Sequence, residues 1–283
     1  RGGQAGLGIA PFYASARLRG KMMWEEHDYR THVARGAFAA EKTEDEAETI
    51  SVLQRSFGMT LAENAGVWWR VFENDWYHQN ETMETIAAMK RAGDASLKTD
   101  KLSIAQVALV YDENVPYYLA GGDNAFLRTQ VWGAYEGAAR MGAPFDMVLL
   151  DDLKGKKLPD YKLYVFLDAY RMDDATRKTI AEKVRKNNAV SVWCYAPGIM
   201  NGEKFSVDSM QELTGIKFSE TRAEQTLTLQ VADKNHPITK FAKPFLPQKF
   251  GPIFSVADPN AKILGTTSNG AALAVREFPN WRS

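Results

Sequence analysis

Apolar residues recur along the chain in short blocks whose spacing alternates between that of a strand and that of a helix. The blocks in the first third of the chain occur in the order strand, helix, strand, helix, which favours a parallel α/β arrangement. The predicted elements there are a strand that begins in the run 21–24, a helix carrying Ile50, Leu53 and Phe57, a strand at 66–72, and a helix at 81–92 that ends at Gly93.

The ends of the first helix carry recognisable signals. Residues 43–46 read Thr-Glu-Asp-Glu, with a hydroxyl and, three residues later, a carboxylate. This is the pattern of a capping box, in which each side chain bonds a backbone N–H of the first turn. We therefore expect the helix to begin with Thr43 as its cap and to end at Gly58.

A polar, lysine-rich segment, 96–103, is predicted to be a linker to a second α/β series. Regular alternation of buried-type strands with helices predicts a doubly wound open sheet, flavodoxin-like in outline. The predicted elements are strands at Ile104–Tyr111, Met147–Leu150, Tyr164–Leu167 and Ala189–Trp193, a helix capped by Asp123 that runs to Gly142, a helix opened by Asp173, and, beyond residue 216, short strands including 272–275 between proline-rich loops.

The composition is that of an ordinary globular protein, and it excludes some functions. The 283 residues are 45% hydrophobic, and 35 basic residues balance 35 acidic ones. A net charge of zero gives no reason to expect a nucleic acid or an anionic membrane as partner. The apolar runs are too short for a membrane span, and a single cysteine excludes an internal disulfide and a cysteine-based zinc site.

The densest chemistry lies at residues 24–32, which read Trp-Glu-Glu-His-Asp-Tyr-Arg-Thr-His. Side chains of an extended strand alternate between its two faces. One face would then carry Trp24, Glu26, Asp28 and Arg30, and the other Glu25, His27 and Tyr29. Two carboxylates and a guanidinium on one face can hold a carboxylate ionised for catalysis.

A solvated strand end is the plainer interpretation of such a charge cluster. Two features argue for a site instead. The charges follow an apolar strand and precede a helix, which is where the active-site residues of a (β/α)₈ barrel lie. Tryptophans also gather nearby, and aromatic faces beside carboxylates suit a carbohydrate, whose C–H faces stack on the rings. The tryptophans concerned are Trp24, Trp68, Trp69 and Trp76.

Residues 15–32, which contain the run Glu-x-Asp-x-Arg-Thr-His, resemble the late-barrel segment of enzymes similar to glycoside hydrolase family 42, the β-galactosidase-like group. Val67-Trp68-Trp69 resembles the last barrel strand of that group. Residues 104–283 resemble its flavodoxin-like trimerisation domain. The resemblance implies the end of a catalytic barrel at 1–95, the linker at 96–103, and a trimerisation-type domain at 104–283.

The resemblance also implies retaining hydrolysis by two carboxylates, without a metal or organic cofactor. Glu26 matches the nucleophile position best, and Glu25 is the alternative. Asp28 and Arg30 are expected to form a supporting ion pair on the Glu26 face, with Trp24 and Trp69 as supporting or substrate-binding aromatic residues. The implied partners are a carbohydrate substrate, with β-galactosides as the candidate, and further copies of the chain in a trimer.

One family feature is missing. The acid/base should lie on an earlier barrel strand, typically in an Asn-Glu pair, whereas Glu73 and Asn74 stand in the opposite order after the last strand. Because the chain also begins at Arg1 without a methionine, we interpret it as a fragment that is inactive alone and assign it no compartment. The rival interpretation is a non-catalytic carbohydrate-binding or oligomerisation module.

Two other sites can be weighed in the second half. Cys194 follows a predicted strand, as the nucleophile of class I glutamine amidotransferases does, but Trp193, Tyr195 and Ala196 replace the glycines of that strained turn. We interpret Cys194 as structural. The loop 112–116 carries two carboxylates in place of the Ser/Thr/Gly-rich cradle that flavin mononucleotide needs, so no flavin is expected.

Overall fold

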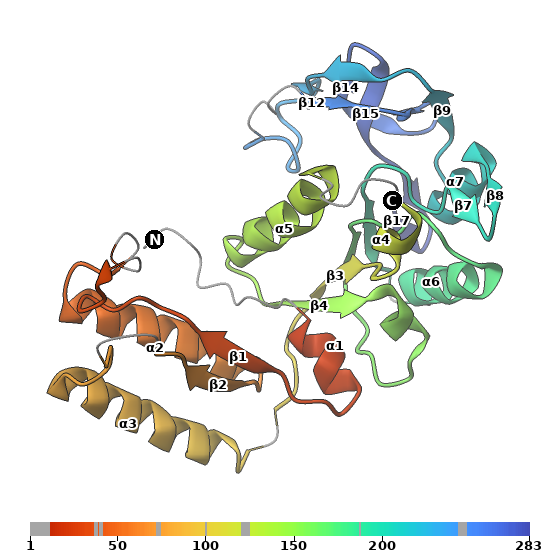
Figure 1. Ribbon diagram of the computed structural model, residues 1–283. Coiled ribbons are helices and arrows are strands. Elements are labelled where there is room, and N and C mark those ends of the chain that lie inside the picture. The colour runs from red at the N-terminus through yellow and green to blue at the C-terminus, as the bar shows by residue number, and fades with distance from the viewer. Residues whose placement is uncertain are drawn as a thin grey trace. The chain divides into compact units, whose positions relative to one another are not determined.

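The computed structural model describes residues 12–36, 39, 42–71, 75–99, 101–119, 125–186, 188–242 and 248–283. The chain divides into two compact units, drawn in Figure 1. The first comprises 1–104 with 135–148, and the second comprises 105–134 with 149–283. Each is described by itself below.

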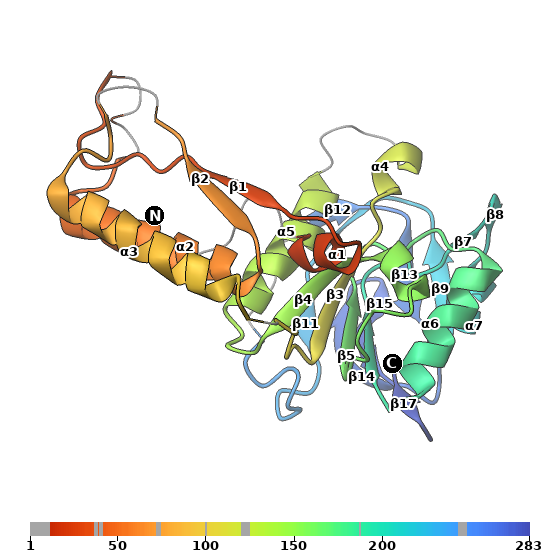
Figure 2. The same cartoon turned by 90° about the horizontal axis from the view of Figure 1, so that it is seen from below.

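Helices and a two-stranded parallel sheet make up the first unit, which begins with α1. Strands β1 and β2 pair in parallel, with Glu26 opposite Trp68 and His27 opposite Trp69. Figures 1 and 2 show α2 and α3 side by side, along one side of this strand pair. The elements are α1 (Tyr13–Leu18), β1 (Trp24–His27), α2 (Glu46–Ala62), β2 (Gly66–Trp69) and α3 (Asn80–Ser96).

The helices of the first unit are longer than the glycine and capping patterns predicted. The cap of α2 is Asp45, whose carboxylate accepts a hydrogen bond from the Glu48 N–H at 2.8 Å, and not Thr43. Thr43 instead bonds Thr49 through the two hydroxyls. Helix α2 passes through Gly58, and α3 passes through Gly93. A glycine costs only about 1 kcal/mol in a helix, which packing readily offsets.

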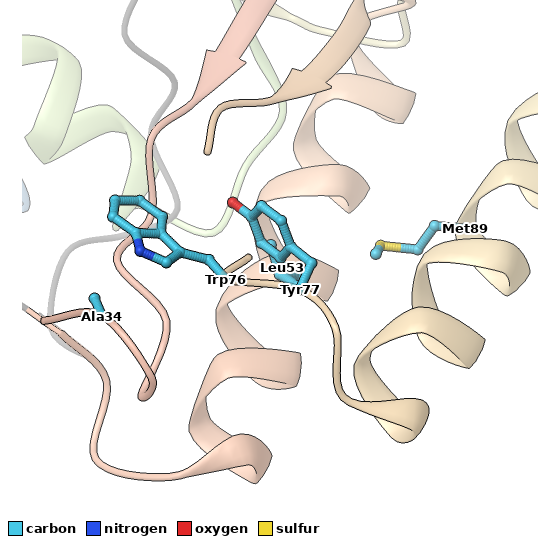
Figure 3. Packing of buried hydrophobic residues seen from close by; sticks show 5 residues of the cluster. All are labelled: Ala34, Leu53, Trp76, Tyr77 and Met89. Carbon is cyan, nitrogen blue, oxygen red and sulfur yellow. The ribbon is translucent and has the colours of Figure 1, made fainter. Parts of the chain in front are cut away.

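A compact apolar cluster joins the two long helices of the first unit to the segment after β2. Its buried members are Ala34, Leu53, Trp76, Tyr77 and Met89. In Figure 3, Met89 of α3 points toward Leu53 of α2 and Tyr77. Burial of large side chains such as these contributes about 1.5–3 kcal/mol each, so the cluster is a main source of stability for the unit that holds β1.

The second unit contains the predicted parallel sheet. Strands β17, β6, β5 and β3 lie side by side in that order, each pair in parallel. Residues of α5 and β4 are divided between the two units. The elements in chain order are β3 (Val107–Tyr111), α4 (Val115–Tyr118), α5 (Ala125–Ala139), β4 (Phe145–Leu149), a 3₁₀ helix (Leu150–Lys154), β5 (Leu163–Phe166), α6 (Asp174–Lys186), β6 (Val190–Trp193), β7 (Met200–Asn201), β8 (Lys204–Phe205) and α7 (Val207–Thr214).

Beyond residue 216 the second unit contains short strands, as predicted, and these strands pair in antiparallel fashion. Strands β11, β14, β15, β13 and β9 form one sheet in that order, β10 pairs with β12, and β16 pairs with β17. The bounds are β9 (Phe218–Thr221), β10 (Gln225–Leu227), β11 (Gln230–Val231), β12 (Gln248–Phe250), β13 (Ile253–Val256), β14 (Lys262–Thr267), β15 (Gly270–Val275), β16 (Glu277–Phe278) and β17 (Trp281–Arg282).

Two predicted helix caps in this unit have different outcomes. Asp173 accepts a hydrogen bond from the Thr176 N–H at 2.7 Å and opens α6, as expected. Asp123 lies outside the described residues. No helix among the described residues is long and apolar enough to cross a membrane.

Candidate active site

Strand β1 has two chemically different faces. Glu25 and His27 are buried, whereas Trp24 and Glu26 are open to solvent, with 63% of Trp24 exposed. This confirms the predicted alternation for the four residues of the strand. The pairing with β2 extends each face across two strands, because residues that pair in register point to the same side.

Glu25 lies on the buried face and is held by the protein itself. The Tyr13 hydroxyl of α1 donates a hydrogen bond to the Glu25 carboxylate. Burial, together with this hydrogen bond, raises the pKa of Tyr13 far above its usual range, so Tyr13 stays a donor. Only 4% of the Glu25 residue is exposed, so its carboxylate faces the interior of the unit.

Glu26 lies on the open face and has a cation as its partner. The Arg70 guanidinium lies next to β2 and places Nη1 2.6 Å from Glu26 Oε1. The Arg70 backbone N–H also donates to the His27 carbonyl at 3.1 Å, which continues the pairing of the strands by one residue. This backbone hydrogen bond therefore fixes the position from which the Arg70 side chain extends toward Glu26.

Glu26 finds its cation next to the neighbouring strand. Among the described residues Glu26 pairs with Arg70 and not with Arg30. The reason is that β1 ends at His27, so Asp28 and Arg30 follow the strand and are not part of its alternation. Asp28 Oδ1 is buried and accepts no hydrogen bond from the residues that the structure describes.

The tryptophans are also distributed differently from the prediction. Trp69 shares the buried face with His27, at a ring-centroid distance of 6.5 Å, and packs against the apolar cluster of the helices. Trp68, which is 41% exposed, lies beside Glu26 instead. Sequence reasoning named Trp68 among the nearby tryptophans without placing it beside Glu26, and it missed Arg70. Only the register of β1 against β2 could have indicated both positions.

His27 has the environment of a core residue. It has no exposed surface, and neither ring nitrogen finds a hydrogen-bond partner among the described residues. Burial lowers the pKa of His27 to about 4, because a charged imidazolium would lose its hydration there. The ring is therefore neutral near pH 7 and packs against Tyr29 at 5.1 Å between centroids.

Cys194 and the loop 112–116 are the two candidate sites that were weighed in the second unit. Burial raises the pKa of the Cys194 thiol to about 11, so hardly any reactive thiolate exists near neutral pH. This favours the structural interpretation of Cys194. In the loop after β3, the Asp112 carboxylate accepts from the Asn114 N–H at 3.0 Å and from the Tyr118 hydroxyl at 2.8 Å, so both its oxygens are bonded within this segment.

Three or more side chains able to bind a metal do not come together anywhere in the described part of the chain. Glu73 and Asn74, whose reversed order was noted in the sequence, lie outside the described residues. On the open face of β1 and β2 the residues are Trp24, Glu26, Gly66 and Trp68. This face thus offers one ion-paired carboxylate between two aromatic rings.

No protein-family model and no curated protein sequence matches the chain. Solved structures do match it. A cold-adapted β-galactosidase from Rahnella sp. R3 gives a TM-score of 0.63 at 13% identity, over 99% of this chain and 44% of that one. A GH42 β-galactosidase from G. stearothermophilus gives 0.56 at 12% identity, over 82% and 36%.

An exo-β-1,4-mannosidase from Opitutaceae bacterium strain TAV5 is similar at the same level. Its TM-score is 0.55 at 13% identity, over 84% of this chain and 44% of the mannosidase. The chain spans less than half the length of each of these enzymes. At such identities the likeness concerns the fold, so the chain has the fold of a part of these glycoside hydrolases.

Proposed function

We propose that the chain is part of a retaining glycoside hydrolase in which Glu26 is the nucleophile. The observation that supports this most directly is the open face of β1, where Glu26 is accessible, paired with Arg70 at 2.6 Å and flanked by Trp24 and Trp68. A nucleophile must be both ionised and within reach of substrate. Glu25, the alternative, is buried, and its carboxylate accepts a hydrogen bond from the Tyr13 hydroxyl.

The proposed reaction uses Glu26 as one of two carboxyl groups. Glu26 attacks the anomeric carbon and forms a covalent glycosyl-enzyme as the bond to the leaving group breaks, and water then releases the sugar. The second group protonates the leaving oxygen and later takes a proton from the water. It would come from another barrel strand, since Glu26 is the sole carboxylate on the open face of β1 and β2.

The substrate class and the role of the second unit follow from the same proposal. Terminal β-galactosides are the candidate substrates, because the similar proteins from Rahnella sp. R3 and G. stearothermophilus are β-galactosidases. The similar mannosidase makes β-mannosides the substrates for comparison. The domain limits 1–95 and 104–283 and the flavodoxin-like character of the second domain belong to this proposal. The second domain then serves trimer assembly, which light scattering of the full-length protein tests.

The test is Glu26→Gln in the full-length protein, assayed on p-nitrophenyl β-D-galactoside and β-D-mannoside. We expect the turnover of the preferred substrate to fall by at least about 10³-fold, with an unchanged thermal midpoint, because the amide cannot form the covalent intermediate. Azide should restore turnover to Glu26→Ala, since it can occupy the vacated space and attack.

The matched control is Glu25→Gln, the same change on the neighbouring residue. It should retain most of the activity, because the amide oxygen still accepts from Tyr13 and the open face is untouched. Normal activity of Glu26→Gln would contradict the assignment and favour the rival, a carbohydrate-binding or oligomerisation module with a structural ion pair.

A further inference from the structure

Gly66 and Trp24 form a matched pair on the open face of the strands. They are opposite each other in the register of β1 and β2. A Cβ built on Gly66 would lie 2.9 Å from Trp24 Nε1, 3.0 Å from Cδ1 and 3.3 Å from Cε2. The pyrrole ring of the indole therefore occupies the space that any other residue at position 66 would fill with its side chain.

The backbone of Gly66 does not itself require a glycine. Its φ is not among the positive values of the described chain, and its N–H donates to the Met23 carbonyl at 2.8 Å as part of the strand pairing. An alanine could adopt this extended conformation without strain. A side chain at position 66 is therefore excluded by the Trp24 indole and not by the backbone conformation.

Trp24 and Glu26 share the open face of β1. Trp24 precedes Glu26 by two residues on the same face, which separates them by about 7 Å along the strand. The Trp24 residue keeps 63% of its surface exposed although the indole covers Gly66. It therefore presents an exposed apolar surface on the face that carries the Glu26 carboxylate.

Resting on the proposed glycosidase function, we propose that Trp24 is a sugar-stacking residue below Glu26 and that Gly66 is the positioning residue that lets it lie across β2. The ligand class is a pyranoside with an apolar C–H face, as in a terminal β-galactoside. Stacking on an aromatic ring is worth about 0.5–1.5 kcal/mol beyond the buried area. In binding this corresponds to roughly a 2- to 12-fold effect.

The experiment measures binding separately from turnover. In full-length protein carrying Glu26→Gln, the Kd for p-nitrophenyl β-D-galactoside is measured by calorimetry with and without Gly66→Ala. We expect Gly66→Ala to raise the Kd about 3- to 10-fold. In the otherwise unchanged protein it should raise KM by a similar factor and change kcat less than about twofold.

A double-mutant cycle separates a positioning role from a general structural one. Trp24→Ala should weaken binding at least as much as Gly66→Ala, and the glycine substitution should have no further effect in the Trp24→Ala background. The control is Gly58→Ala in α2, where an added Cβ meets no atom within 4 Å. It should leave Kd and KM unchanged.

Two results would overturn the inference: a Kd within twofold of the parent in Gly66→Ala, or the same loss with and without Trp24. Trp24→Phe provides a milder variant, and it should retain part of the affinity. Failure of the proposed function looks different, because Glu26→Gln would then still turn over substrate, and the comparison would rest on the KM values of the Gly66→Ala and Trp24→Ala proteins.

Discussion

Glu26 in the first unit and Asp168 in the second are both carboxyl groups at parallel strands, but their surroundings are opposite. Glu26 has one third of its side chain exposed and a guanidinium at 2.6 Å. Asp168, two residues after β5, has no exposed surface, and its Oδ1 accepts from the Asp112 N–H at 2.8 Å. Burial, reinforced by Asp112 and Glu113, raises the pKa of Asp168 to about 8.

The difference separates a carboxylate that can react from a carboxylic acid that is part of the core. A nucleophile needs access to its substrate and a compensated negative charge, which Glu26 has. A fully buried acid without a cation keeps its proton, because the charge would lose its hydration. A perturbed pKa by itself is thus a poor guide to the catalytic group in this chain.

The largest effect is expected from Asp168→Asn. Folded Asp168 holds a proton that the unfolded chain releases above its ordinary pKa of 3.8. Stability is therefore lost as pH rises from about 4 to 8, by roughly 2–5 kcal/mol in total. Asparagine cannot ionise, so it should be more stable than the parent at pH 8 by that amount and similar at pH 4.

Amide hydrogen exchange of β3 and β5 at pH 5 and pH 8, corrected for intrinsic rates, measures this effect within the second unit. Asp151→Asn is the control, because Asp151 is 59% exposed in a surface ion pair with Lys154 and should change stability by less than about 1 kcal/mol. Equal pH dependence in Asp168→Asn and the parent would mean that Asp168 is ionised in the folded protein.

The first unit should respond to pH in the opposite sense through His27. Its folded pKa of about 4 lies below the ordinary 6.5, so the unfolded chain binds a proton first as pH falls. Stability is present above pH 6.5 and declines between 6.5 and 4, by roughly 2–3 kcal/mol. His27→Phe keeps a ring beside Tyr29 and Trp69 and should remove most of this decline.

The prediction is tested by urea unfolding of the first unit at pH 4.5 and pH 7.5, with hydrogen exchange of the β1 and β2 amides as the readout. His32→Phe serves as the comparison, because His32 bonds Thr49 through Nδ1 at 3.1 Å near the start of α2. The His32→Phe variant should be less stable than the parent at both pH values, whereas the His27→Phe variant should be more stable than the parent only at pH 4.5. A gain at neither would contradict the buried, neutral state of His27.

The smallest change in stability is expected from Tyr13→Phe, which affects Glu25 and leaves its neighbour Glu26 untouched. Tyr13→Phe removes the hydroxyl that bonds Glu25 and should lower the stability of the first unit by about 1–2 kcal/mol. Tyr117→Phe, at a residue that is 86% exposed, should have no measurable effect. An unchanged thermal midpoint in Tyr13→Phe would show that Glu25 does not depend on this bond.

Local patterns predicted much of the first unit. Alternation correctly separated Glu26 from Glu25, since a strand of period two imposes it whatever lies around the chain. The capping pattern located the start of α2 within two residues, but Asp45 took the place of Thr43 because Thr43 bonds Thr49. Such competition between nearby polar groups depends on the fold and not on the local spacing.

The partners of Glu26 could not be predicted in this way. Arg70 is 44 residues away in sequence and meets Glu26 only because β2 pairs with β1 in one particular register. A shift of one residue would have placed Trp69 beside Glu26 instead of Trp68. Strand β3 of the second unit was easier, because its apolar run is buried on both faces.

The adjacency of Glu25 and Glu26 has a practical consequence for anyone aligning this chain with others. An alignment error of one position still places a glutamate at the expected column, so it raises no alarm, yet it exchanges a buried side chain for an open one. Tyr13 and Arg70 help to resolve the ambiguity, because Tyr13 bonds Glu25 and Arg70 bonds Glu26. Sequences that keep the arginine after the second strand can thereby be aligned on Glu26 with confidence.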